Sequence, residues 1–463
     1  MATLIQQKPR HSTLPVGQEV IFTVSNAAIV SAFTNVKFIA EVHISSTFAP
    51  VISTSADLVG TFKTTPNNTG VGMFDFRPII ESFVKADNLA MRGSAYKGTV
   101  NTSDTNVPMH LIDRYSGNEN SMRYLAIRFK IEYINADGEL IIGQDMVDSS
   151  LYKLFNGYLK YTDILDLVGT DFGYNLSSFN LNSYSKSFLT NAPSIQYANL
   201  EDYGTIPILT LDDNLDFIKL IYKNSNGTTI GNENISKSSA NGAFDTYNAD
   251  IGFELLFFGC FPANLQGSSA GFQSLVSAGT IEGGSIVVQA FNDASAVISK
   301  EYTININCPS GKGFEPIRLT WLNQWGTWDY YTFTMKSSKM ISTKGSTYQQ
   351  LAGSWNEATY RIDSFKGGKK AFRVNANEKI TMNTDFVNES ESEWFEELIN
   401  SPEVYILEGF RDETATPNTA LNQYVTPVRL TTSSYTKKTI ANDRLMQYTF
   451  EVEKSKTLRT QAV

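Results

Sequence analysis

The chain has 463 residues, of which 38 are basic and 47 acidic, so its formal net charge at pH 7 is −9. This acidic balance, without any Lys/Arg-rich run, argues against tight binding to nucleic acid. The length argues against a single domain, because one hydrophobic core stops growing near ~250 to 300 residues, and we expect two to four domains.

The composition favours strands and turns over helices. Aromatic residues make up 12% of the chain, including 22 Tyr and 29 Phe, and such residues are enriched in strands. The polar residues are mainly Asn, Ser, Thr and Gly, which are common in turns. We expect a mainly β, multidomain fold with a few short helices, in which a central immunoglobulin-like β-sandwich is flanked by β/helix units.

Residues 1–168 are predicted to form an N-terminal β-rich domain. The segments "EVIFTVSNAAIV" and "KFIAEVHIS" have strand patterns, and one face of the second carries Phe38, Ala40, Val42 and Ile44. The segment "FDFRPIIESFV" predicts a short helix, which Asp75 caps and Pro78 opens. Asp137-Gly138 predicts a type I′ turn between the strands "RYLAIRFKIEYI" and "ELIIG".

Residues 169–205, which are rich in turn formers, are predicted to be an extended connection. Residues 206–312 are predicted to form the β-sandwich, with strands at "DFIKLIYKN", "GFELLFFGCF", "GSIVVQAF" and "EYTININC". The last strand alternates, with Tyr302, Ile304, Ile306 and Cys308 on its inward face. Buried free thiols are favoured over a disulfide for Cys260 and Cys308.

Residues 313–463 are predicted to form a C-terminal β-rich domain with one short helix. The helix is expected in "SEWFEELINSPEVYIL", where Trp394 and Leu398 have helical spacing and Pro402 follows the helix end. The acidic residues before it are expected at the helix N-terminus, where the helix dipole favours them. A strand in "RLMQYTFEVEKSK" is expected to precede a frayed tail.

The segment "FEPIRLTWLNQWGTWDYYTF" holds three of the five tryptophans and predicts a hairpin with a loop at Asn323–Gly326. The predicted register sets Trp321 opposite Trp328 and lets Arg318 pair diagonally with Asp329. Most of this cluster is expected in a core. The loop tip is expected to be exposed, and the candidate contact residues are Trp325, Trp328, Tyr331 and Arg318.

Residues for catalysis, cofactors or metals are sparse. The three histidines, His11, His43 and His110, lie far apart in the sequence and are expected at the surface, without the spacing of a zinc site. The segment "LDDNLD" favours a solvated turn over a calcium site, because it lacks the Gly and distal Glu of a calcium loop. No phosphate-loop spacing occurs. We expect no enzyme, no cofactor and no metal; a glycosidase with Asp329 or Glu315 is a third hypothesis.

The sequence predicts assembly inside a cell, because "MATLIQQKPRHSTLP" has no secretory signal and no run of ~18 apolar residues predicts a membrane span.

The segments "FLTNAPSIQYANLEDYGTI", "GFEPIRLTWLNQWGTWDYYTF", "SPEVYIL" and "RLMQYTFEVE" resemble virion structural proteins of tailed phages that infect Bacteroidetes, including the crAss-like phages. The likeness covers roughly residues 185 to 205 and 310 to 455.

That resemblance implies a ring-forming tail or neck protein around the DNA conduit, located in the virion and assembled in the host cytoplasm. It implies partners in a homo-oligomeric ring and in other tail, neck or portal proteins. Genomic DNA is expected to pass an acidic wall without tight binding, and no membrane is expected as a partner. The alternative, drawn from the residues, is a carbohydrate-binding or host-adhesion protein with Trp325, Trp328 and Tyr331 as a stacking platform.

Overall fold

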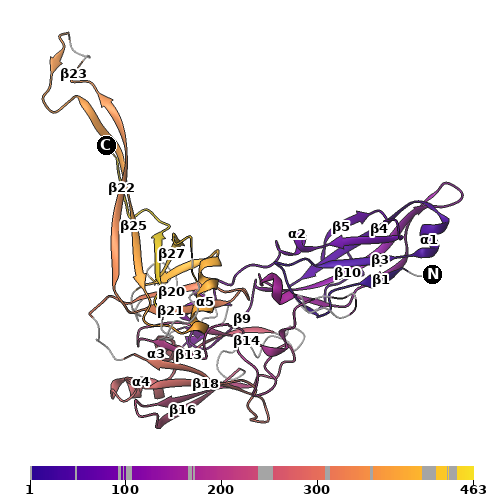
Figure 1. The fold of residues 1–463 in the computed structure, drawn as a ribbon, viewed down its shortest axis with the longest axis horizontal. Helices are drawn as coiled ribbons and strands as arrows, with labels where there is room; N and C mark the ends of the chain where they lie inside the picture. Colours follow the sequence, from indigo (N-terminus) through magenta and orange to yellow (C-terminus); the bar gives the residue numbers. More distant parts are fainter. Residues whose placement is uncertain are drawn as a thin grey trace. The chain divides into compact units, whose positions relative to one another are not determined.

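The computed structural model describes residues 3–46, 49–91, 95–96, 99–100, 107–164, 169, 171, 173–237, 254–307, 313–354, 358–408, 424–434, 436 and 446–462. It is mainly β with short helices and several sheets, which confirms the predicted fold class (Figure 1). Backbone contacts divide it into two compact units. Unit 1 comprises residues 1–309, 322–329 and 411–421, and unit 2 comprises residues 310–321, 330–410 and 422–463. The finer four-part division stays a prediction.

The N-terminal part of unit 1 contains two sheets. The smaller has the order β1 (Leu4–Gln7), β3 (Ile21–Ser25), β6 (Val71–Asp75); the larger has the order β2 (Thr13–Pro15), β12 (Tyr152–Phe155), β10 (Met122–Ile134), β4 (Thr34–Ser45), β5 (Leu58–Thr64), with β11 (Leu140–Asp148) also paired to β10. Phe22 of the first sheet lies 5.7 Å from Phe129 of the second, between ring centroids. The alternating apolar residues predicted for β4 are buried in the shared core.

Two local predictions for this part need correction. The predicted strand pattern continues after β3 as helix α1 (Ala27–Ala32), whose first turn is capped by the Asn26 side chain. The β10–β11 hairpin is confirmed, but its turn is not type I′, because only Gly138 has a positive φ of 83° in the turn. The Asn135 amide bonds to the Glu139 carbonyl, which leaves a three-residue loop. The predicted short helix is confirmed as α2 (Arg77–Ile80), but its N-cap residue is Phe76, which makes no side-chain cap bond; Asp75 instead accepts a bond from the Arg77 amide.

The central part of unit 1 also contains two sheets. One has the order β13 (Ile195–Ala198), β19 (Tyr302–Ile306), β18 (Ser285–Phe291), β15 (Phe217–Lys223), β16 (Thr229–Ser236), and the other β14 (Thr205–Leu209), β17 (Leu255–Gly259), β9 (Tyr115–Gly117). The predicted strands are confirmed, and β19 alternates as expected; Cys308 lies outside the described residues. The predicted connection contributes β13, parallel to β19.

Short helices and pairings complete unit 1. Helices α3 (Pro262–Ser268) and α4 (Ala270–Ser277) lie between two of the predicted strands, and the Ser269 side chain caps α4. The 3-10 turns are η1 (Met109–Leu111), η2 (Tyr161–Ile164) and η3 (Leu176–Ser178), and β7 (Ala95–Tyr96) pairs with β8 (Thr99–Val100).

Unit 2 is built on one large sheet. Its order is β21 (Trp328–Phe333), β20 (Ile317–Leu322), β26 (Val404–Leu407), β27 (Val425–Leu430), β28 (Thr449–Lys454), β25 (Gly368–Asn383), β22 (Ser337–Gln350), and β29 (Arg459–Ala462) pairs with β25. The small pair β23 (Gly353–Ser354) and β24 (Arg361–Ile362) lies between β22 and β25 in the chain. The expectation of a frayed tail is wrong, since β29 belongs to the sheet.

Helix α5 (Glu389–Asn400) confirms the predicted helix of unit 2. Asn388 and Glu391 form a capping box at its start, and Pro402 follows its end. Its apolar side packs on the sheet, where the ring of Phe395 lies 5.5 Å from that of Phe450, between centroids. Trp394 lies 4.8 Å from Trp321 in the same way.

Candidate interaction surfaces

The tryptophan hairpin is a core element, as expected for most of its residues, but its tip is not exposed. Trp325 is only 2% exposed, and its ring lies 4.7 Å from that of Phe179 and 5.4 Å from that of Tyr174, between centroids. The loop around it therefore packs within unit 1 rather than facing solvent. The expectation that Trp325 is free for contact with a partner or ligand is wrong, because unit 1 itself supplies the aromatic neighbours.

The other three predicted contact residues are also enclosed to different degrees. Trp328 is 1% exposed and lies 5.1 Å from the His110 ring, between centroids. Arg318 is buried over the Tyr330 ring, and Tyr331 is half-buried. Two of the three members of the predicted sugar-stacking platform are therefore inaccessible to a ligand, and the carbohydrate-binding alternative stays a prediction.

The register of this hairpin differs by one residue from the prediction. The Asn323 amide donates to the Thr327 carbonyl at 2.8 Å, and Arg318 Nη1 donates to Thr332 Oγ1 at 2.7 Å. Both bonds fit a three-residue loop that ends at Gly326, which has a φ of 74°. The predicted pairing of Arg318 with Asp329 stays a prediction; Asp329 accepts a bond of 2.6 Å from Thr190 Oγ1.

Unit 2 contains a long hairpin, not predicted from the sequence, in which most side chains of one strand are exposed. Strands β22 and β25 extend well beyond the rest of their sheet (Figure 1), and we call residues 337–383 the arm. β28 pairs with the arm only over Lys379–Asn383, and β29 only over Arg373–Ala376. At roughly 3.3 Å per residue, the 14 residues of β22 span about 46 Å. Between Arg373 and the tip, the arm is therefore a ribbon of only two strands, β22 and β25.

Large apolar side chains are exposed along the arm and at its tip, the segment between β22 and β25. At the tip, Ile362 is 73% and Phe365 70% exposed, and other exposed apolar residues of the arm are Met340, Ile341, Leu351, Tyr360 and Phe372. A ribbon two strands wide has no core in which to bury such side chains. Large exposed apolar side chains that gather on one element are a feature of protein interaction sites.

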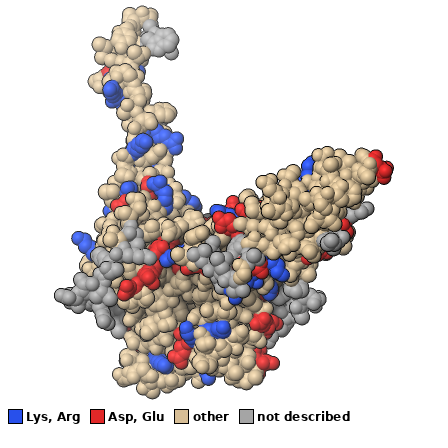
Figure 2. All heavy atoms as spheres, turned by 45° about the vertical axis from the view of Figure 1, so that its right-hand side comes forward, with Lys and Arg blue, Asp and Glu red and all other residues tan. Residues whose placement is uncertain are grey.

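The arm is basic although the chain is acidic. Between residues 339 and 373 the sequence has five Lys and two Arg but only Glu357 and Asp363 as acidic residues. Basic side chains recur along the arm in Figure 2. Asp363 is shared by Arg361 and Lys366 at the tip, at 3.4 and 2.9 Å. In the described part of the chain, no carboxylate pairs with Lys344, Lys369, Lys370 or Arg373.

The pairing register sorts these residues onto two faces. Lys344 pairs with Asn375 and Ser346 with Arg373, so the two basic residues lie on one face. The same face, which we call the basic face, carries Met340, Lys344, Tyr348, Lys370, Phe372 and Arg373, and the rings of Tyr348 and Phe372 lie 6.4 Å apart, between centroids. The opposite face carries Ile341, Thr343, Gly345, Val374 and Ala376, together with Lys339 and Lys369.

A second exposed apolar surface lies on β11 in unit 1. Ile141 and Val147 pack against the core, whereas Leu140, Ile142 and Met146 are each more than half exposed. The same hairpin has the acidic residues Asp137, Glu139, Asp145 and Asp148 and no Lys or Arg between residues 135 and 150. We call the exposed apolar and acidic residues from Asp137 to Met146 the β11 surface.

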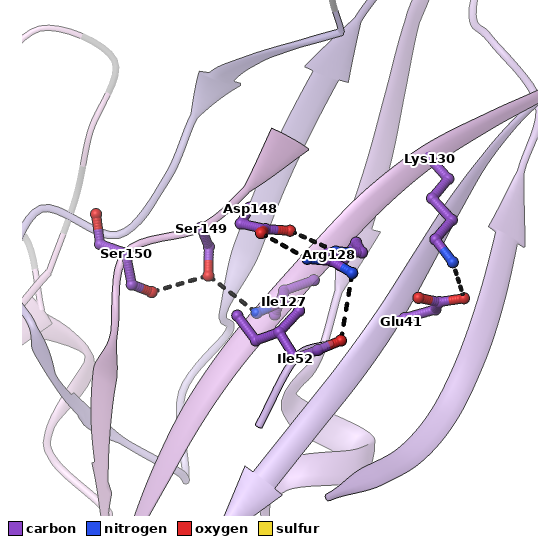
Figure 3. A network of polar contacts seen from close by, with 8 residues as sticks. All are labelled: Glu41, Ile52, Ile127, Arg128, Lys130, Asp148, Ser149 and Ser150. Atoms are coloured by element: carbon purple, nitrogen blue, oxygen red, sulfur yellow. Dashed lines mark hydrogen bonds and ion pairs between the residues drawn. The ribbon is translucent and has the colours of Figure 1, made fainter. Parts of the chain in front are cut away.

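The ion pairs beside β11 set this surface apart from the rest of the sheet. Arg128 holds Asp148 through two bonds of 2.7 and 2.9 Å, and Lys130 pairs with Glu41 at 2.5 Å (Figure 3). The bond from Arg128 lowers the pKa of the Asp148 carboxyl. Within the described ranges, by contrast, no basic group pairs with Asp137, Glu139 or Asp145, so the β11 surface keeps its negative charge uncompensated.

The chain was compared with known proteins, and its described residues were searched for groups that could hold a metal ion. No protein-family model matches the chain, and no curated protein matches it. Among the described residues no group of three His, Cys, Asp or Glu is placed to hold a metal ion, and no helix is long and apolar enough to cross a membrane. In the "LDDNLD" turn, Asp213 pairs with Lys237 and Asp212 accepts a bond from Asn180.

Two expectations about single residues are also settled by burial. His43 is 1% and His110 2% exposed, so the prediction that every histidine lies at the surface is wrong. His43 is on a central strand of the larger N-terminal sheet, where both faces near it are covered. Cys260 is buried as expected, and its predicted companion Cys308 lies outside the described residues.

Proposed function

We propose that this protein is a bacteriophage virion structural protein, a ring-forming component of the tail or neck that assembles around the DNA conduit. The observation that supports this proposal best is the arm, which exposes Ile362 and Phe365 at its tip and buries little within its own chain. Contact with a neighbouring subunit would bury these exposed apolar side chains. The proposed location is the virion, after assembly in the host cytoplasm.

The physical argument concerns the free energy of ordering the arm. Fixing each backbone residue costs roughly 1–2 kcal/mol, which buried apolar surface normally offsets. In the arm, most side chains of β22 remain exposed. An assembly that buries them recovers this free energy through extended contacts, and head-to-tail contacts between identical chains close into rings when the rotation allows it.

The proposed partners are copies of the same chain and other tail, neck or portal proteins. The resemblance of several segments to phage virion proteins supports the same assignment. The net charge of −9 favours a conduit wall that DNA passes without tight binding, while the basic arm is a local exception to that charge. The absence of an enzymatic role remains part of the proposal.

The proposal is tested by measuring the mass and shape of the purified chain over a range of concentrations. Light scattering after size exclusion and negative-stain imaging are expected to show closed multimers. Antibody labelling of intact particles is expected to mark the tail or neck. A chain that stays monomeric at all concentrations and does not occur in particles contradicts the proposal.

A variant without the tip separates assembly from folding. Thr347 and Ala371 face each other across the arm, so residues 348–370 can be replaced by Asn-Gly, which favours a tight two-residue turn. This deletion keeps the pairing of β25 with β28 and β29. The variant is expected to keep the thermal stability of the full chain and to lose most of its multimers.

A further inference from the structure

We infer that the arm of one copy docks through its basic face on the β11 surface of a neighbouring copy. The inference rests on the proposed self-assembly and goes beyond it by assigning the two surfaces that meet. Because the arm and β11 are different parts of the chain, the contact is heterologous, and repeating it generates a ring or a filament.

The two surfaces have matching chemistry. The basic face combines the apolar Met340, Tyr348 and Phe372 with three cations, Lys344, Lys370 and Arg373. The β11 surface combines the apolar Leu140, Ile142 and Met146 with three carboxylates, Asp137, Glu139 and Asp145. Charges of opposite sign around apolar contacts are the arrangement that gives an interface its orientation and specificity.

The state of the charges supports this pairing over the other acidic groups of the larger N-terminal sheet. Elsewhere on the larger N-terminal sheet the acidic groups already have partners: Glu132 bonds to Lys63, and Asp148 to Arg128. Among the described residues, Glu139 and Asp145 have no basic partner, and Lys344 and Arg373 on the arm have no acidic partner. Each surface therefore carries the charge that the other lacks.

A protein partner fits the arm better than a nucleic acid does. Phosphate groups would pair with Lys344 and Arg373, but a phosphate surface gives no burial for Met340 or Phe372 on the same face. A β11 surface offers both the negative charge and the apolar contacts. Binding of DNA by the arm is accordingly kept as an outcome of the test.

The contact is expected to use side chains rather than a continuous sheet between copies. On β11, Gly143 and Asp145 have φ values of 81° and 53°, and the register against β10 shifts twice. Such bulges disturb the outer edge of a strand and prevent regular pairing with another strand. The outward side chains of β11 remain available to the arm.

Reversing the charges of each surface gives a direct test. Variant A carries Asp137→Lys and Glu139→Lys, which avoids the left-handed position of Asp145, and variant B carries Lys344→Glu and Arg373→Glu. In each variant alone, arm and β11 surface have the same sign, so the apparent dissociation constant of the multimer is expected to rise about tenfold or more. In an equimolar mixture, each arm meets a β11 surface of opposite sign, and assembly is expected to return.

Matched variants control for the change in net charge. Glu282→Lys with Glu301→Lys, and Lys85→Glu with Lys300→Glu, place the same reversals on exposed residues outside both surfaces. These variants are expected to assemble like the unchanged chain. Melting temperatures of all variants show whether folding is intact.

The outcomes separate this inference from the proposed function. Multimers that form normally in A and B, or that are lost in both and not restored by mixing, overturn the pairing of arm and β11 while leaving ring formation in place. Binding of a DNA duplex by the unchanged chain that B alone loses, with assembly unaffected, assigns the arm to nucleic acid instead. An unchanged chain that never assembles overturns both proposals.

Discussion

The indole nitrogen of Trp328 donates a hydrogen bond of 2.8 Å to the main-chain carbonyl of Asp87, 241 residues earlier in the chain. The Asp87 carboxylate in turn accepts bonds from the amides of Glu119, Asn120 and Ser121, at 3.2, 2.7 and 3.2 Å. Burial raises the pKa of Asp87, and these bonds oppose the rise. Within unit 1 the hairpin tip is therefore anchored to a loop that a buried carboxylate organises.

Trp328→Phe is expected to destabilise unit 1 by about 1–3 kcal/mol, because the buried Asp87 carbonyl loses its donor. Trp325→Phe is the matched control: Trp325 is equally buried, and its indole nitrogen has no partner among the described residues. Calorimetry is expected to show a clearly larger fall in melting temperature for Trp328→Phe. Equal falls would mean that the hydrogen bond adds little to packing.

Gly326→Ala is expected to be more damaging than its position in a loop suggests. A Cβ at residue 326 would lie 2.2 Å from the Asn156 carbonyl oxygen, and the φ of 74° is unfavourable for any side chain. Together these effects cost about 2–5 kcal/mol. Gly138→Ala, with a φ of 83° and no atom within 4 Å of the new Cβ, isolates the backbone cost of about 1–2 kcal/mol. Similar losses of unfolding free energy for both variants would show that the backbone near Asn156 shifts to accommodate the new Cβ.

The sequence predicts elements well where an apolar period marks a buried face. In strands β4 and β19 the apolar residues of the predicted inward faces are buried, and α5 combines a capping box with apolar residues at helical spacing. Helix α4 was missed because its signal is one side chain, Ser269, in a stretch otherwise rich in Gly and Ser. Capping by a single residue is weak evidence in sequence.

The candidate surfaces were missed for a related reason. β22 reads as a run of Ser, Thr and Lys with isolated Met and Ile, and it has no apolar face because most of its side chains are exposed. For the tryptophan loop, the prediction was wrong in the opposite direction, since it expected exposure where the structure shows burial. Sequence places Trp325 at a turn, where exposure is the usual state, and only long-range contacts to residues such as Phe179 bury it.

Buried His43 gives the protein a dependence of stability on pH. Burial lowers the pKa of His43 below 6.5, and Arg128 adds to this, while the carboxylates of Glu41, Asp57 and Asp148 oppose it. The unfolded chain therefore binds a proton at His43 at a higher pH than the folded protein does. The stability contributed by neutral His43 is present above pH ~6.5 and is lost as the pH falls through the range below it.

The measurement is the melting temperature of unit 1 between pH 7.5 and 5.5, compared with His43→Phe. The unchanged chain is expected to lose stability toward pH 5.5 more steeply than the variant, because the variant has no group to protonate at this position. Parallel curves would assign the pH dependence to other groups. A variant that does not fold at pH 7.5 is replaced by His43→Gln, which also lacks a titrating ring.

Removal of residues 457–463 is expected to loosen the arm without unfolding unit 2. β29 pairs with Arg373–Ala376, and the Leu458 amide adds a bond of 2.8 Å to the Ala376 carbonyl. Without β29 this part of the arm has two strands, and isolated two-stranded hairpins are marginally stable. The free energy of local opening is expected to fall by about 1–3 kcal/mol, since a net hydrogen bond contributes about 0.5–1.5 kcal/mol.

The local opening of the arm is measured by hydrogen exchange of individual backbone amides. Amides of residues 373–376 and of the facing strand are expected to exchange faster in the truncated chain, while the amides of α5 keep their protection. Arg459→Ala with Gln461→Ala is the control, because it removes two exposed side chains of β29 and keeps its backbone pairing. Protection that falls as much in this control as in the truncation would show that side chains, rather than the third strand, stiffen the arm.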